Sequence, residues 1–143
     1  MQYSARVSDK AAEGGPDREA LDDDDIVVRG GLMASDFLIR NAEEHHRNPQ
    51  TRGEWALSVA SLPDCTIDEI LEQAVRIKNR QCRTTRAGTL REAGYEVVSD
   101  RPPHALVMLD GPLTEGTCRE LRALFSVQID NPYHNERSNR GTK

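Results

Sequence analysis

The stretch Tyr95–Asp110, which reads YEVVSDRPPHALVMLD, decides the expected fold. Two runs suited to strands, 95–99 and 104–110, are separated only by Arg101-Pro102-Pro103, which predicts two strands joined by a short loop. The second run is apolar on both faces over 105–109, so we expect it in the middle of a sheet. Two strands that follow one another directly point to an α+β domain rather than to a simple alternation of strands and helices.

Upstream of this stretch, strand and helix patterns alternate. Period-2 or β-branched runs predict strands, and apolar spacings of three and four predict helices. The predicted strands are 26–29, 54–62 and 81–86, and the predicted helices are 32–46, 67–78 and 87–93. A last helix is expected from Thr114 on. The order is therefore β-α-β-α-β-α-β-β-α, which we interpret as a mixed sheet of about five strands with helices packed on it.

The helix that starts after Thr66 has the clearest signal, because Thr66 and Glu69 match a capping box. The apolar faces of the predicted elements also define a core. Its expected members are Val27, Leu38, Trp55, Leu57, Ile70, Leu71, Leu106, Val107, Leu121 and Phe125.

Charge and composition predict three parts in the chain. Residues 1–25 hold eight acids and three bases and so carry the whole net charge of −5, while the rest balances to zero. Like charges without apolar periodicity favour a solvated chain. We therefore expect a disordered acidic arm over 1–25, a globular domain over 26–130 and a disordered tail over 131–143.

The compartment follows from what the sequence contains. Cys65, Cys82 and Cys118 are widely spaced and form no CxxC pair, which is typical of reduced thiols. No apolar run approaches the roughly 20 residues that span a bilayer, and the N-terminus has no apolar signal-peptide core. These observations predict a soluble cytoplasmic protein that does not enter a membrane.

The first candidate site combines Arg29-Gly30-Gly31 with the segment Ser58–Ser61, which reads SVAS. A guanidinium beside glycines can bind a phosphate or a carboxylate with two hydrogen bonds, because the backbone there is uncrowded. Serines spaced along a second strand can line the same pocket. The alternative is that the glycines form a tight turn and that Arg29 makes a surface ion pair.

These segments resemble those of ADP-ribosyltransferases, which have an Arg on a first strand, a Ser-Thr-Ser segment on a later strand and a downstream Glu. SVAS stands at the second position here, and Glu96 is the substitute for the third. The resemblance implies a small transferase or toxin that uses NAD as its cosubstrate. Its site would contain Arg29, Ser58, Ser61 and Glu96.

The second candidate site is a basic stretch, which consists of Arg76, Lys78, Arg80, Arg83, Arg86 and Arg91. Such a run can follow a phosphate backbone, so the stretch predicts binding of a polyanion or of another partner. The acidic arm could fold over it within the same chain. The alternative is that these bases pair with acids elsewhere on the surface.

Histidines supply the last candidates. His45 and His46 follow Glu43 and Glu44, but adjacent residues of a helix point about 100° apart, and no second carboxylate–histidine pair completes a metal site. We therefore expect no metal. His104 begins a strand and is either a general base or a partly buried structural histidine.

No phosphate loop, dinucleotide fingerprint, nucleophile elbow or zincin motif is present. The first expectation is therefore a non-enzymatic interaction module without a cofactor, which binds a macromolecular partner. A protein is the preferred partner and a nucleic acid the lesser one. The alternative is the ADP-ribosyltransferase-like enzyme that uses Arg29 and the serine segment.

Overall fold

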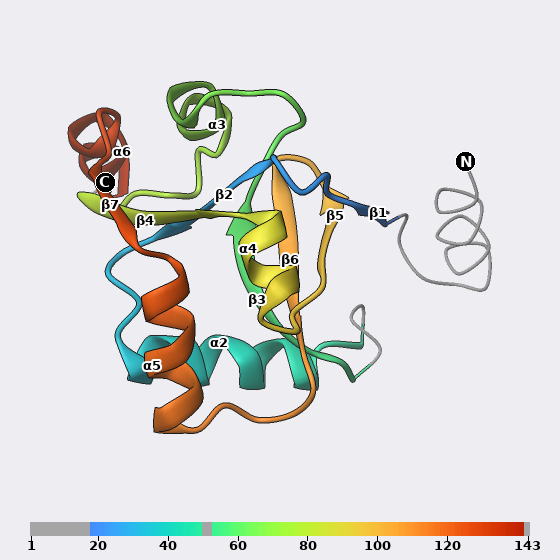
Figure 1. Ribbon diagram of the computed structural model, residues 1–143. Coiled ribbons are helices and arrows are strands. Elements are labelled where there is room, and N and C mark those ends of the chain that lie inside the picture. The colour runs from blue at the N-terminus through green and yellow to red at the C-terminus, as the bar shows by residue number, and fades with distance from the viewer. Residues whose placement is uncertain (1–17, 50–52, 142–143) are drawn as a thin grey trace.

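Figure 1 shows the computed structural model, which describes residues 18–49 and 53–141. Seven strands form one antiparallel sheet in the order β1-β5-β6-β3-β2-β4-β7. The strands are β1 (Glu19–Ala20), β2 (Ile26–Gly30), β3 (Trp55–Ala60), β4 (Gln81–Arg86), β5 (Val97–Arg101), β6 (His104–Leu109) and β7 (Val127–Asp130). The helices are α2 (Ser35–Arg47), α3 (Ile67–Gln73), α4 (Ala87–Glu92), α5 (Glu115–Leu124) and α6 (His134–Gly141).

The expected α+β class is confirmed, but the sheet differs from the prediction in strand number and in strand direction. It has seven strands instead of about five, and its pairings are antiparallel instead of mixed. Strands β1 and β7 were missed because they are two and four residues long and carry little apolar pattern. The helices between strands suggested parallel crossovers, yet α2 returns the chain so that β3 runs antiparallel beside β2.

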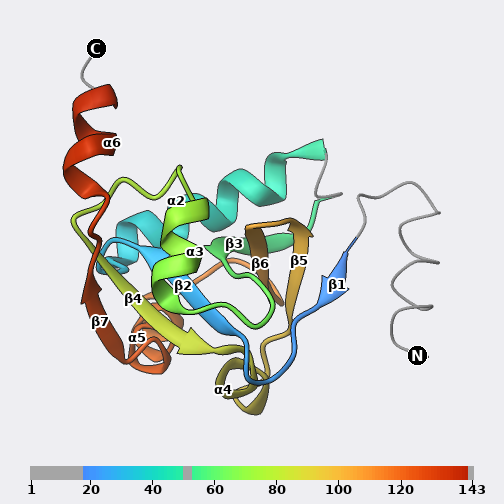
Figure 2. The same cartoon turned by 90° about the horizontal axis from the view of Figure 1, so that it is seen from above.

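Both ends of the described chain contain secondary structure within the ranges 1–25 and 131–143. Within the predicted acidic arm, residues 19–20 pair with β5, and Leu21 and Asp25 are buried. Within the predicted tail, α6 follows β7 and buries Arg137. Residues 1–17, the rest of the predicted arm, lie outside the described residues. Strands β1 and β7 form the opposite edges of the sheet (Figure 2).

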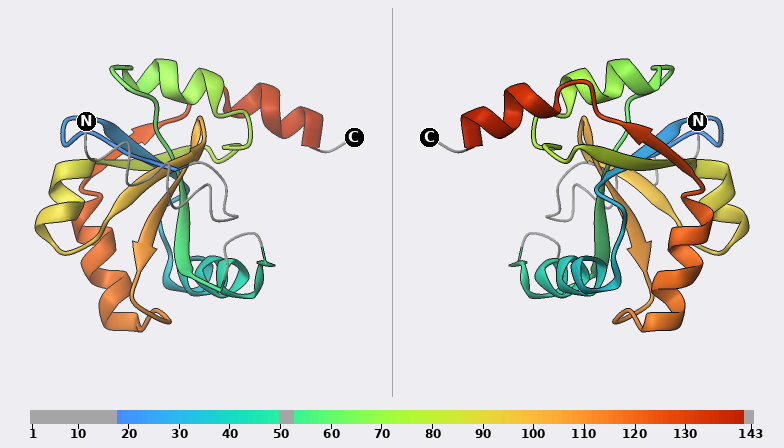
Figure 3. Two further views of the ribbon diagram at one scale, coloured as in Figure 1. Left: turned by 90° about the vertical axis from the view of Figure 1, so that its right-hand side faces the viewer. Right: turned by 90° about the vertical axis from the view of Figure 1, so that its left-hand side faces the viewer.

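Helices cover both faces of the sheet, and each face has its own apolar cluster. Helices α2, α4 and α5 cover one face, here called the α5 face, and helices α3 and α6 lie together on the other, here called the α3 face (Figure 3). Alternation along β2 separates the faces, because Val27 belongs to the cluster of the α5 face and Val28 to that of the α3 face.

The predicted core is confirmed for nine of its ten members, which are at most 1 % exposed. Trp55 is half-buried instead, with its ring stacked on His46 at a centroid distance of 4.0 Å. Because β3 buries Leu57 and Val59 on the α5 face, Ser58 turns toward the α3 face.

Helix α3 begins where the sequence predicted but ends earlier. The capping box of Thr66 and Glu69 is formed, with hydrogen bonds of 2.7 and 3.2 Å. The helix ends at Gln73 rather than near residue 78, and Val75 is 60 % exposed. The chain from Gln73 to β4 is therefore an irregular connection, which becomes one wall of the cavity described next.

Candidate functional site

The site is built around a split in the sheet between β2 and β3. The two strands share a single register pair, Val28 with Ala60, and separate beyond it. At the split, the carbonyl of Ser58 accepts a hydrogen bond of 2.8 Å from Nη1 of Arg29, and its N–H donates to Oδ1 of Asn41 at 2.8 Å. Two side chains thus satisfy the backbone groups that a neighbouring strand would otherwise pair.

Arg29 is a half-buried cation held by neutral groups. Its Nη1 also donates to Oδ1 of Asn41 at 2.8 Å, and its Nε has no hydrogen-bond partner among the described residues. None of the ion pairs in the described part of the chain involves Arg29. Burial lowers its pKa to about 10, with only partial compensation from the charge of Glu44, so Arg29 is protonated at neutral pH.

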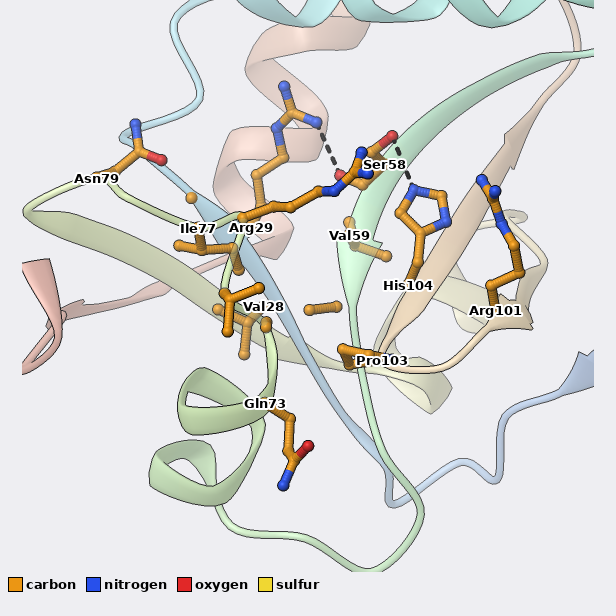
Figure 4. A pocket seen from close by; sticks show the side chains of 15 residues that line it. Val28, Arg29, Ser58, Val59, Gln73, Ile77, Asn79, Arg101, Pro103 and His104 are labelled. Atoms are coloured by element: carbon orange, nitrogen blue, oxygen red, sulfur yellow. Dashed lines mark hydrogen bonds between the residues drawn. The ribbon is translucent and has the colours of Figure 1, made fainter. Parts of the chain in front are cut away.

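A cavity of about 530 Å³ opens beside this split. Its floor comes from β2 and β3, one wall from the connection between α3 and β4, and the opposite wall from the β5–β6 hairpin (Figure 4). The polar and charged residues that line it are Arg29, Ser58, Gln73, Arg76, Asn79, Arg101 and His104. No Asp or Glu is among the described residues that line this cavity, which therefore carries the charge of three arginines.

The C-terminal segment holds the wall between α3 and β4 in place. Arg137 of α6 donates to four carbonyls at the end of α3 and just beyond it, those of Leu71, Glu72, Ala74 and Ile77, at 2.6 to 3.1 Å. Helix ends leave such carbonyls without partners inside the helix, so this side chain acts as a cap supplied from elsewhere in the chain. Nδ2 of Asn131 adds bonds to the carbonyls of Ile77 and Asn79.

Gly30 allows the same wall to approach the floor. A Cβ atom at this position would lie 2.4 Å from Oδ1 of Asn79 and 3.1 Å from Cγ2 of Ile77. The glycine therefore serves close approach of side chains at the cavity, whereas Gly31, at a φ of 84°, serves the turn that follows β2.

Ser58 stands at the centre of a polar network on the cavity side. Its Oγ lies 2.8 Å from Nε2 of His45 and 3.1 Å from Nε2 of His104. Nδ1 of His104 lies 2.7 Å from Oδ1 of Asp100, whose side chain is 7 % exposed. Figure 4 shows Arg29 and His104 reaching Ser58 from opposite sides.

Two pKa shifts follow from this network. Burial, and after it the nearby His104, lower the pKa of His45 below its ordinary value, so His45 is neutral at pH 7. Burial alone would raise the pKa of Asp100, but the hydrogen bond and the charge of His104 outweigh it and leave the pKa of Asp100 below its usual range. Asp100 is therefore ionised at neutral pH.

The residues of the ADP-ribosyltransferase resemblance are only partly brought together. Arg29 and Ser58 meet at the cavity. Ser61 is buried and bonds the carbonyl of Ile26 at 2.6 Å, and Glu96 pairs with Arg91 at 2.8 Å; neither lines the cavity.

The basic stretch is dispersed over the molecule. Arg76 lines the cavity, and Lys78 and Arg80 are exposed near it. Arg83 points to the carbonyls at the end of α5. Arg86 binds the carbonyl of Asp24 at 2.7 Å, and Arg91 pairs with Asp23 at 2.7 Å. The described part of the acidic arm thus contacts the last two members of the stretch.

The paired histidines diverge, as expected for neighbours on a helix. His45 faces Ser58, while Nδ1 of His46 bonds the carbonyl of Gly53 at 2.6 Å. Within residues 18–49 and 53–141, no group of three or more metal-binding side chains lies close enough to hold an ion.

Sequence reasoning did not single out Asn41, Asp100 and Arg101 as site residues. Asn41 lies on the helix face that turns toward the split, which became visible only once α2 was placed against β3. Asp100 reaches His104 because the pairing of β5 with β6 shifts register between Ser99 and Arg101. A cue was present in the sequence, since an Asp stands four residues before His104 across a proline turn.

Comparisons with protein families, with curated proteins and with solved structures found no match to this chain. In the described part of the chain, none of the helices combines the length and the apolar character that crossing a membrane requires. Cys82 and Cys118 are buried and Cys65 is half-buried, and all three are free thiols.

Proposed function

We propose that this protein binds a small anionic molecule, one that carries a phosphate or a carboxylate group, in the cavity between the α3–β4 connection and the β5–β6 hairpin. The observation that carries this proposal is Arg29, a half-buried guanidinium without a carboxylate partner in the described chain, beside a cavity lined by two further arginines.

Electrostatics supports an anion rather than a neutral ligand. Transfer of a charge out of water is costly unless an opposite charge or several hydrogen bonds compensate it. Arg29 has neutral acceptors on Nη1 only, and no carboxylate lines the cavity. A phosphate or carboxylate would add the missing charge and accept paired hydrogen bonds from guanidinium groups.

The dimensions of the cavity support a small molecule. Ligand sites usually measure between about 300 and 1,000 Å³, and this cavity measures about 530 Å³. Its apolar lining, which includes Val28, Val59 and Ile77, offers contact area for the part of the ligand that carries no charge. A nucleotide-sized molecule fits this combination of one charged end and one apolar wall.

The proposal shares Arg29 and Ser58 with the ADP-ribosyltransferase resemblance. NAD contains a diphosphate and is therefore one of the ligands to test. Because Glu96 lies outside the cavity, we test NAD as an anionic ligand and not as the cosubstrate of a transferase.

Calorimetric titration of the full chain with phosphate, pyrophosphate, AMP, NAD and succinate tests the proposal at low and at high salt. We expect micromolar to millimolar binding of at least one of them, which weakens as salt rises. Arg76→Ala and Arg101→Ala should each weaken it about ten- to hundredfold, since a hydrogen bond to a charged group contributes about 1.5 to 3 kcal/mol. Both side chains are on exposed residues, so the fold should persist.

Arg119→Ala is the matched control. Arg119 is exposed on α5 and pairs with Glu115 at 3.9 Å. Its removal changes the net charge as much as the cavity variants do but leaves the cavity intact. The proposal fails if none of the five anions binds at low salt, or if Arg119→Ala weakens binding as strongly as Arg101→Ala does.

A protein partner is a second proposal, and the edge strand β7 is the observation that favours it. Strand β7 pairs with β4 on one side only and ends the sheet, and Val127 on it is 51 % exposed. Such an edge can accept an extended segment of another protein as an added strand. Co-purification from the native host should lose a bound protein in Val127→Lys and keep it in Ala123→Lys, a charge added on exposed α5. Equal recovery in both variants would contradict this second proposal.

A further inference from the structure

The strands around the cavity bring a serine, a histidine and an aspartate into one hydrogen-bonded series. Ser58 and Ala60 share a face of β3, and His104 pairs with Ala60, so His104 is a diagonal neighbour of Ser58 on that face. The register shift between Ser99 and Arg101 inserts Asp100 into β5. Such bulges redirect a side chain, and here the Asp100 carboxylate reaches Nδ1 of His104 at 2.7 Å.

The hydrogen bonds define one arrangement of protons for the neutral form of His104, the form that a general base requires. Ionised Asp100 can only accept, so Nδ1 of His104 carries a proton, and in this form Nε2 is an acceptor. The hydroxyl of Ser58 must then donate to Nε2 of His104 at 3.1 Å. Since this hydroxyl has one proton, the contact of 2.8 Å from His45 is an Nε2–H that donates to Oγ.

We propose that Ser58 is the nucleophile of an ester hydrolase whose substrate is a small ester bearing a phosphate or carboxylate group. The proposal rests on the proposed function for the hold on that anionic group, through Arg29, Arg76 and Arg101. It goes beyond that function because it assigns a reaction to the cavity: Ser58 and His104 are the catalytic residues, and Asp100 and His45 are positioning residues.

The reaction balances without any redox partner. Oγ of Ser58 attacks the ester carbonyl carbon while Nε2 of His104 takes the hydroxyl proton. The carbon–oxygen bond to the alcohol then breaks, and the protonated His104 gives its proton to the departing alkoxide. Water then attacks the acyl group on Ser58. His104 takes a proton from the water molecule while the water oxygen attacks the carbonyl carbon. The bond between that carbon and Oγ breaks, His104 returns the proton to Oγ, and the acid leaves.

Each neighbour of Ser58 has a role in this reaction. The N–H of His45 donates a hydrogen bond to Oγ of Ser58, so the hydroxyl proton of Ser58 points to His104. Asp100 fixes the ring of His104 in the tautomer that accepts at Nε2 and stabilises its protonated form. Arg76 and Arg101 line the same cavity and supply positive charge for the oxyanion that develops on the substrate.

Labelling with a fluorophosphonate, which reacts with activated serines, tests the proposal on the full chain. For the protein without substitutions, we expect the intact mass to show one adduct. Mass spectrometry of its tryptic peptides should locate that adduct on Ser58. Ser58→Ala should abolish it, and Ser126→Ala, an exposed serine of the same chain, should leave it unchanged. His104→Gln should slow labelling about a hundredfold or more. Thermal melting of each variant shows whether the fold persists.

The pH profile separates a positioning role of Asp100 from a structural one. The charged and titratable groups that face the network are His45 and Glu44 on α2, Arg29 on β2, and Arg76 and Arg101 at the cavity. Asp100→Asn removes the carboxylate that contacts His104, so labelling should slow about a hundredfold and its midpoint should move to lower pH. A purely structural Asp100 would leave the midpoint unchanged.

The two proposals fail in different ways. If calorimetry detects anion binding but the fluorophosphonate leaves Ser58 unlabelled, the hydrolase proposal is overturned and the binding function stands. Labelling of Ser58 that His104→Gln does not slow also overturns it. Labelling that depends on His104, and that a bound anion slows about in proportion to its occupancy, supports both.

Discussion

The two faces of the sheet are packed by different means. On the α5 face, three helices bury a continuous apolar cluster with Phe125, Leu38 and Leu121 fully enclosed. On the α3 face, the cluster is smaller, and hydrogen bonds from Arg137 and Asn131 hold the cavity wall. Apolar contact fixes shape without direction, whereas these polar contacts place particular backbone atoms. The comparison indicates that the α5 face supplies most of the buried apolar contact. The α3 face supplies the cavity, to which α2 adds Asn41 and His45.

The largest expected effect comes from the α5 face. Phe125→Ala removes a fully buried ring and should lower the free energy of unfolding by about 3 to 5 kcal/mol, because both the transfer energy and a cavity are involved. Urea unfolding measures this free energy. Val127→Ala is the control, because Val127 is exposed and its truncation should change the free energy of unfolding very little. A loss below about 1 kcal/mol for Phe125→Ala would remove the distinction between the faces.

An intermediate effect is expected on the α3 face. Arg137→Met removes donors to four carbonyls and should cost about 1 to 3 kcal/mol, and it should also weaken anion binding several-fold by loosening the cavity wall. Arg122→Met is the matched control, since Arg122 also donates to a backbone carbonyl, that of Met33 at 2.7 Å, but on α5.

Unfolding and calorimetry on the same samples separate the two arginine variants. Both should lose stability, but only Arg137→Met should lose affinity for the anion that the unmodified protein binds. Equal affinity in both variants would show that α6 contributes to stability alone. The cavity wall would then depend on its other contacts, such as those of Asn131.

The smallest effect is expected at Gly30. Gly30→Ala forces Asn79 away from the β2 floor, where the added methyl group would be 2.4 Å from its Oδ1. Because a side chain can move more cheaply than backbone, stability should change by about 1 kcal/mol or less, while anion affinity should fall a few-fold. Gly111→Ala, where nothing lies within 4 Å of the added atom, is the control. Unchanged affinity in Gly30→Ala would place Asn79 outside the binding site.

Much of the fold was accessible from the sequence because it depends on local patterns. The alternation over 54–62, the capping box at Thr66 and the apolar run 105–109 each predicted an element that the structure contains. Strand β7 could not be predicted in this way, since three of its four residues are exposed and only its pairing with β4 makes it a strand.

The candidate site was accessible only in pieces. Arg29, Ser58 and His104 each carry a local signal, namely glycines, spaced serines and a strand start. Their meeting depends on the neighbours β3 and β6, on the split beside β2 and on the bulge that redirects Asp100. These are properties of strand order and register, which residues far apart in the sequence determine together.

The contact of Arg137 with the end of α3 makes the C-terminus an energetic partner of the cavity. Docking of α6 and the ordered form of the 73–79 wall favour one another, and any ligand that prefers this wall joins the same linkage. The coupling is reciprocal: the free energy by which a docked helix improves ligand binding equals the free energy by which the ligand retains the helix. A filled cavity would therefore protect Arg137 and the residues around it from proteolysis and slow the exchange of their amide hydrogens, although the ligand touches none of them.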